Sequence, residues 1–117
     1  MSPEKIFPKK ILDAMPSIET SVDMSSDKVK VPLKVFNAAG GQTWYLTAYD
    51  PEDRIFWCYA NLGNPMFAEC GTVSQDEMLD NDAQLSPLIL MLERDFYWNP
   101  DTTLQEVIDK VQNGVHV

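Results

Sequence analysis

The chain has 117 residues, 44% hydrophobic and 23% charged, which is the composition of a globular domain and excludes a disordered segment. This length predicts one α+β domain over residues 1–117, with short polar tails at 1–6 and 114–117. No apolar run approaches the roughly 20 residues of a membrane span. The amino terminus also lacks the layout of a secretory signal, so we expect a cytoplasmic location and no membrane contact.

The net charge of −9 is unevenly distributed along the chain. Residues 1–49 hold six lysines against five acids, whereas residues 50–117 hold thirteen acids against three basic residues. An acidic surface repels phosphate backbones and attracts basic protein surfaces. We therefore expect no direct nucleic-acid binding and a protein partner with a basic surface. The alternative is that the acids serve solubility alone.

The first half of the chain begins with a helix predicted over residues 8–15, which Pro16 ends, and a polar loop follows to residue 27. From Lys28 to Phe36 apolar and polar residues alternate, as they do in a half-buried strand. Pro32 and the lysines at the alternate positions predict that this is an edge strand.

Three further strands are predicted at residues 42–49, 54–62 and 66–73, separated by turns rich in glycine, proline and asparagine. If each turn joins antiparallel neighbours, one sheet face is entirely apolar, which supports a meander. The predicted facing pairs are Val35 with Trp44, Leu46 with Cys58, Ala48 with Phe56, and Cys58 with Cys70.

The opposite sheet face is expected to be aromatic with polar tips, an arrangement favoured at binding surfaces. A helix or the C-terminal segment could instead cover this face as a second core layer. The candidate partner- or ligand-binding residues are Tyr45, Tyr49, Trp57, Tyr59, Phe67, Glu69 and Arg94.

The second half of the chain contains two capping boxes. Ser74 and Glu77 open a helix that extends to about residue 84, and Thr103 and Glu106 open a last helix that ends at Gly114. Between them, residues 88–97 are too short and apolar to assign by period, and their bulky aromatics favour a fifth strand over a helix. The first of these helices carries the predicted acidic interaction surface, although acids near its start also stabilise the helix dipole. These acids are Asp76, Glu77, Asp80 and Asp82.

Catalytic chemistry is not favoured by the residue inventory. The only histidine, His116, lies near the end of the chain, and both cysteines are expected to be reduced and buried in the apolar face. We expect no metal and no cofactor. Glu69 is the sharpest acid–base candidate, because burial beside Trp57 and Phe67 would raise its pKa. Arg94, within Glu93-Arg94-Asp95, could clamp an anion or tie neighbouring acids together.

The order of several short motifs resembles an uncharacterised family, domain of unknown function twenty-nine fifty-eight. The resemblance spans about residues 9–112. It rests on Thr43-Trp44-Tyr45, Glu69-Cys70-Gly71, the Ser74-initiated acidic helix and Glu93-Arg94-Asp95 in this order. It implies accessory cargo of bacterial, plasmid or phage elements and supplies no catalytic residues.

These observations predict an α+β fold, an antiparallel meander of four to five strands with flanking N-terminal, middle and C-terminal helices. They favour a non-enzymatic interaction protein of a mobile genetic element, such as an acidic inhibitor of a host nucleic-acid-binding or defence protein. One alternative is a small-molecule-binding protein that uses the aromatic face, with Arg94 or Lys34 as anion contacts. The other is a small carboxylate-dependent hydrolase.

Overall fold

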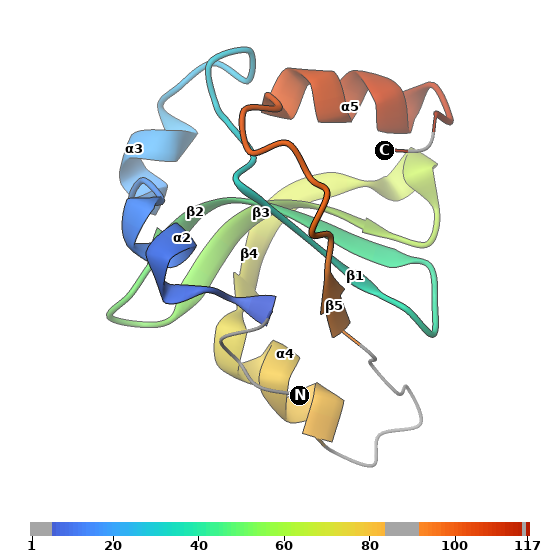
Figure 1. Cartoon of the computed structure of the whole chain (residues 1–117). Coiled ribbons are helices and arrows are strands. Elements are labelled where there is room, and N and C mark those ends of the chain that lie inside the picture. Colours follow the sequence, from blue (N-terminus) through green and yellow to red (C-terminus); the bar gives the residue numbers. More distant parts are fainter. Residues whose placement is uncertain (1–5, 84–91, 116) are drawn as a thin grey trace.

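The computed structural model describes residues 6–83, 92–115 and 117, and the side chains of its middle helix up to Leu79. The described residues form a five-stranded antiparallel sheet of order β4-β3-β2-β1-β5, with helices around it (Figure 1). The strands are β1 (Leu33–Asn37), β2 (Gln42–Asp50), β3 (Ile55–Leu62), β4 (Glu69–Ser74) and β5 (Leu92–Arg94). The predicted α+β meander with flanking helices is confirmed.

The N-terminal and C-terminal helices start differently, since the C-terminal one has a side-chain N-cap and the N-terminal one starts after Pro8 without one. The helix predicted from Pro8 is present as α2 (Lys9–Ala14), and Thr103 caps α5 (Leu104–Gln112) by accepting a 3.2 Å hydrogen bond from the Glu106 N–H. Helix α4 (Gln75–Ala83) lies at the end of the molecule opposite to α5 (Figure 1).

The loop predicted over residues 17–27 is wrong at its start, where α3 (Ile18–Val22) forms. The Ser17 hydroxyl accepts a hydrogen bond from the Thr20 N–H at 3.2 Å, the contact of a helix N-cap. The helix is short, and Ser21 is its buried residue, so apolar periodicity could not signal it.

Strand β1 lies between β2 and β5, so the prediction that it is an edge strand is also wrong. Pro32 lies just before the strand, where its missing N–H removes no ladder bond. The partner strand β5 comes from residues far along the chain and pairs Val35 with Arg94. Nothing in the local alternation of β1 could show this neighbour.

A β-bulge at Thr47 changes the register that strict alternation predicts. The pairs Val35–Trp44 and Leu46–Cys58 are confirmed, but after the bulge Tyr49, and not Ala48, pairs with Phe56. Thr47 is fully buried, and its hydroxyl donates to the Trp57 carbonyl at 3.1 Å. The extra residue therefore rotates Tyr49 onto the face that carries Phe56.

The β3–β4 register also differs from the prediction by one residue. Cys58 lies opposite Gly71, and Cys70 lies opposite Tyr59. Because a one-residue slip moves a side chain to the other face, Cys70 leaves the apolar face that holds Cys58. Cys58 is buried and Cys70 is exposed, both as free thiols, so the prediction of burial is confirmed for Cys58 and wrong for Cys70. The 3-10 turn Pro65–Phe67 takes up the start of the predicted fourth strand and produces this slip.

Strand β5 is shorter than the strand predicted over residues 88–97. Residues 88–91 lie outside the described part of the chain, and the strand ends at Arg94. Phe96 and Tyr97 lie in a turn, where the Asp95 carboxylate accepts a hydrogen bond from the Tyr97 N–H at 2.9 Å. Asp95 favours such a turn because its side chain can bond to the backbone two residues on.

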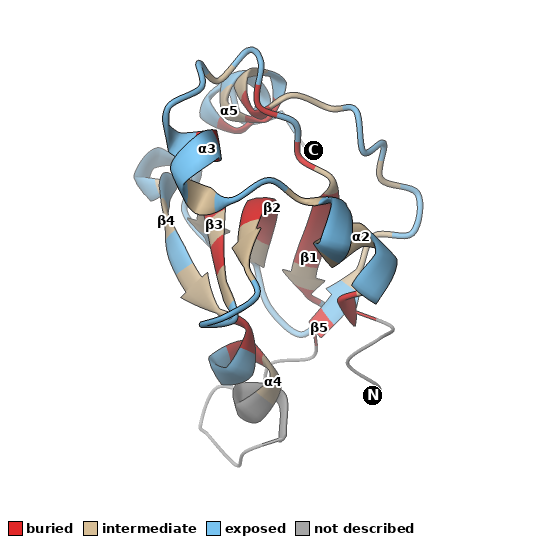
Figure 2. Cartoon of the chain, turned by 90° about the vertical axis from the view of Figure 1, so that its left-hand side faces the viewer, coloured by how far each residue is buried: buried red, intermediate tan, exposed pale blue. Residues whose placement is uncertain are grey.

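Two apolar clusters pack against the sheet, and the central strands carry most of the buried residues (Figure 2). The first cluster joins Phe56, Leu46 and Val35 to Phe7 and to Met78 of α4. The second joins Tyr45 and Tyr59 to α5, and it is described below with the site. Within the described residues, no helix has the length and apolar character needed to cross a bilayer.

Candidate functional site

The predicted aromatic face is covered where it is richest in tyrosine. Tyr45 and Tyr59 are each 3% exposed and pack with Val107 and Val111 of α5. Of the two arrangements that the sequence left open, the covering helix is the one found at this part of the sheet. Trp98 extends the cluster, with its ring centre 5.7 Å from that of Tyr45.

The remaining aromatic candidates do not form one surface with these tyrosines. Tyr49 packs on the other face, with its ring centre 4.7 Å from that of Phe56. Trp57 is half-buried, and Phe67 is 77% exposed in the turn before β4. Glu69 is exposed at the start of β4, so the burial expected for its carboxyl is not found.

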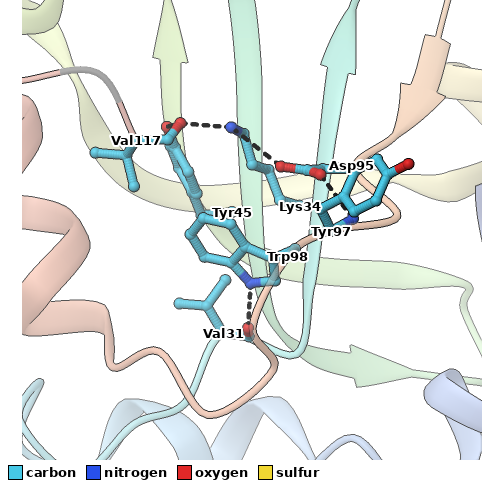
Figure 3. Close-up of polar contacts among 7 residues, drawn as sticks. All are labelled: Val31, Lys34, Tyr45, Asp95, Tyr97, Trp98 and Val117. Carbon is cyan, nitrogen blue, oxygen red and sulfur yellow. Dashed lines mark hydrogen bonds and ion pairs between the residues drawn. The ribbon is translucent and has the colours of Figure 1, made fainter.

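Lys34 lies at the centre of a cluster in which cationic, anionic and aromatic side chains meet (Figure 3). It is 8% exposed, although it carries a charge. Its ammonium lies 3.6 Å from Asp95 Oδ2 and donates a hydrogen bond to the main-chain oxygen of Val117. It also lies 5.5 Å from the centre of the Trp98 ring and 6.0 Å from that of Tyr45. A buried ammonium requires such partners, because its desolvation is otherwise costly.

The segment after β5 holds two of these partners in place. The Asp95 N–H donates to the Lys34 carbonyl at 3.0 Å, which extends the β1–β5 pairing by one bond. The Trp98 indole N–H donates to the Val31 carbonyl at 2.7 Å (Figure 3). Backbone contacts on both sides therefore fix the carboxylate and the indole ring against Lys34.

Tyr45 supplies a second polar group at the same place. Burial raises the pKa of Tyr45 to about 12, with a smaller contribution from Tyr59, so its hydroxyl is protonated at neutral pH. The Tyr45 hydroxyl lies 3.5 Å from the main-chain oxygen that Lys34 contacts, that of Val117. A weak donor and a cation thus converge on one oxygen atom.

A cavity of about 770 Å³ opens beside Lys34, and we call it the Lys34 pocket. It lies between the β1–β2 hairpin, the segment after β5 and the end of α5. Arg94 and Phe96 line one side, with the guanidinium carbon 4.3 Å from the ring centre. Aromatic, amide and charged side chains all contribute to its wall, among them Lys34, Phe36, Thr43, Tyr45, Asn61, Arg94, Asp95, Phe96 and Tyr97.

The pocket offers hydrogen bonds and aromatic surface more readily than nucleophilic chemistry. The buried thiol of Cys58 lies elsewhere, and burial, with a smaller contribution from Cys70, raises its pKa to about 12. Among the residues that the structure describes, no three histidine, cysteine, aspartate or glutamate side chains are grouped so that they could hold a metal ion.

The predicted acidic surface is placed only in part. The N-cap of the predicted capping box is confirmed, since the Ser74 hydroxyl accepts a hydrogen bond from the Glu77 N–H at 3.2 Å. Asp76 and Glu77 are exposed, and the Asp76 carboxylate is 3.0 Å from the Arg54 Nε. The side chains of Asp80 and Asp82 lie outside the described residues.

Sequence reasoning identified Tyr45 and Arg94 as candidate binding residues and named Lys34 as a possible anion contact, and all three line this pocket. It did not predict the cluster that Asp95, Trp98 and Val117 form around Lys34. Lys34 lay in a segment predicted to be an edge strand. Asp95 was one member of the charged triplet Glu93-Arg94-Asp95. The available signal was a tryptophan, Trp98, three residues after that triplet. Its contact with β1 depends on the long-range β1–β5 pairing.

Of three comparisons with known proteins, one gives a match. No curated protein matches it, and no solved structure matches it. A family model described as "Protein of unknown function (DUF2958)" matches residues 8–116. This is the family that the motif order resembled, and the match covers nearly the whole sequence. The chain therefore belongs to the DUF2958 family.

Proposed function

We propose that the protein is a non-enzymatic binding protein that holds a small organic ligand in the Lys34 pocket. The observation that carries this proposal is the pocket itself, with a buried cation in its wall. Its volume of about 770 Å³ lies within the range of roughly 300–1,000 Å³ typical of ligand sites. Such sites combine aromatic walls with a few placed polar groups, as Phe36, Phe96, Lys34 and Arg94 do here.

The polar groups of the pocket favour ligand binding over catalysis. The acid in contact with Lys34, Asp95, accepts hydrogen bonds from the Tyr97 N–H and pairs with the ammonium, so it serves as a structural anion. The Tyr45 hydroxyl keeps its proton because burial raises its pKa to about 12. At neutral pH this hydroxyl can therefore donate a hydrogen bond to a ligand, but it is not a general base.

The test is a thermal-shift screen of small metabolites against the wild type and two tryptophan variants. Thr43→Trp fills the pocket from its β2 wall, whereas Thr72→Trp places the same bulk on exposed β4, away from the pocket. A ligand at about 100 times its Kd stabilises the folded state by about 2.7 kcal/mol. We expect this stabilisation in the wild type and in Thr72→Trp, and its loss in folded Thr43→Trp. Ligands that stabilise all three proteins equally would contradict the site, and a screen without any ligand would contradict the function.

A second candidate function rests on the exposed acids at the start of α4. Here the protein is an accessory of a phage or plasmid that binds a basic surface of a host nucleic-acid-binding or defence protein. Asp76 and Glu77 project from the first turn of the helix, within a chain of net charge −9. Charge complementarity of this kind speeds and selects association.

This candidate predicts a partner that is captured from host lysate at low salt and released as salt rises, because exposed charges are screened. Reversal of Asp76 and Glu77 to lysine should abolish the capture. Reversal of Glu19 and Asp23, two exposed acids at α3, is the matched control and should leave it intact. Capture that is indifferent to salt, or equally sensitive to both reversals, would rule out the acidic surface.

A further inference from the structure

The residues at one end of the Lys34 pocket indicate the chemistry of its ligand, because a segment of the chain itself lies there. Val115 and Val117 line the pocket, and Val117 is partly buried against the cluster of Tyr45 and Trp98. The main-chain oxygen of Val117 accepts a hydrogen bond from the Lys34 ammonium (Figure 3). An oxygen atom attached to a small branched apolar group is thus the chemistry that this end of the pocket receives.

The contacts of Lys34 show why an oxygen acceptor is needed at this position. The Asp95 carboxylate is 3.6 Å away, beyond the 2.7–3.2 Å of a good N–H···O bond, so the ion pair is loose. The close polar contact of the buried ammonium is the oxygen of Val117. The Tyr45 hydroxyl lies 3.5 Å from the same oxygen and can also donate. Two converging donors, one of them cationic, favour an anionic oxygen over a neutral one.

The described residues of the segment that provides this oxygen make few polar contacts. Its last described backbone hydrogen bond runs from the Val115 N–H to the Lys110 carbonyl at 2.8 Å, and Val115 is 52% exposed. Beyond Val115, the described polar contacts of the segment are those of the Val117 oxygen with Lys34 and Tyr45. A ligand that displaces this segment must therefore replace one oxygen acceptor and the packing of the partly buried Val117 side chain.

We propose that the Lys34 pocket binds a carboxylate carried on an apolar group, and that Val117 occupies the carboxylate subsite until such a ligand displaces it. This inference rests on the function proposed above and names its ligand class. The carboxylate contacts Lys34 and Tyr45 in place of the Val117 oxygen. The apolar group extends along the aromatic wall toward Phe36 and Phe96. Free organic acids and the carboxyl ends of peptides share this chemistry.

The test uses two acid–amide pairs on the full chain, followed by NMR titration. One pair is 3-phenylpropanoate and 3-phenylpropanamide, which represent free acids. The other is N-acetylvaline and N-acetylvaline amide, which represent peptide ends. We expect each acid to bind roughly tenfold or more tightly than its amide, because a charge-assisted bond replaces a neutral one. Binding should shift the Val117 amide resonance toward its unstructured position, and the tighter of the two acids identifies the natural source.

Two variants test the roles of the cation and of the segment. In Lys34→Gln the acid and amide of each pair should bind within about twofold of one another, because the cationic donor is gone. Val117→Ala weakens the competing segment and should bind both acids roughly three- to tenfold more tightly than the wild type, a gain that partial unfolding cannot produce. Val22→Ala, at an exposed valine of α3, is the matched control and should leave both affinities unchanged.

The outcomes separate this inference from the function on which it rests. If acids and amides bind alike, or if acids bind without moving the Val117 resonance, the carboxylate subsite is refuted. The binding function still stands in that case if screened ligands are lost in Thr43→Trp and retained in Thr72→Trp. If those ligands are insensitive to Thr43→Trp, the pocket itself is refuted.

Discussion

Replacing Phe56 with alanine is expected to lower the free energy of unfolding by about 3–5 kcal/mol. Phe56 is fully buried, and its ring centre lies 5.2 Å from that of Phe7 and 4.7 Å from that of Tyr49. The substitution removes both ring contacts and leaves a cavity between the sheet and the N-terminal segment. Because domains of this size are typically stable by about 5–15 kcal/mol, a large part of the stability is lost.

Urea unfolding monitored by far-UV circular dichroism measures this effect, and Phe67→Ala is the matched control. Phe67 is 77% exposed, so its truncation should change the free energy of unfolding by no more than about 0.5 kcal/mol. Similar losses for the two variants would mean that the turn before β4, and not the Phe56 cluster, carries the packing.

Alkaline pH is expected to destabilise the protein from about pH 9 upward, by about 1.4 kcal/mol per pH unit from Cys58 alone. Burial, with a smaller contribution from Cys70, raises the pKa of the Cys58 thiol from 9.0 to about 12. Above pH 9 the unfolded chain therefore loses a proton that the folded chain retains, and the free energy of unfolding falls as pH rises. Tyr45 adds to the loss above pH 10, since its pKa is raised from 10.0 to about 12.

The measurement is the free energy of unfolding in urea between about pH 8 and about pH 11. In Cys58→Ala the decline between pH 9 and pH 10 should largely disappear, while the part due to Tyr45 should persist above pH 10. Cys70→Ala is the comparison, because burial also raises the pKa of the Cys70 thiol but Cys70 is exposed and Cys58 is buried. The removal of Cys70 should therefore leave most of the decline. Parallel curves for wild type and Cys58→Ala would show that the thiol ionises equally in both states.

The parts of the fold that local sequence encodes could be predicted. Strand alternation and turn residues gave the order and pairing of β1, β2 and β3, and the capping boxes at Ser74 and Thr103 marked the two later helices. These signals lie within a few residues of the structure that they specify. Local propensity and tertiary packing agree at these places.

The parts that depend on a single residue of register, or on distant contacts, could not be predicted. The bulge at Thr47 and the turn Pro65–Phe67 each shift the alternation by one residue, which moves Tyr49 and Cys70 to the opposite face. The cluster around Lys34 was not predicted because it depends on distant contacts. Three of the groups around the buried Lys34 ammonium, those of Asp95, Trp98 and Val117, come from the other end of the chain.

The position of β5 beside β1 has a consequence for the order in which the chain folds. The hairpins from β1 to β4 connect neighbours in sequence, whereas the pairing of Val35 with Arg94 closes a loop that contains all of them. Closing the longer loop costs more chain entropy, and contacts of this kind slow folding. The meander can assemble before β5 docks, so the last strand to join the sheet is also the one that brings Asp95 and Trp98 to Lys34. We therefore expect the Lys34 pocket to form only when β5 docks against β1.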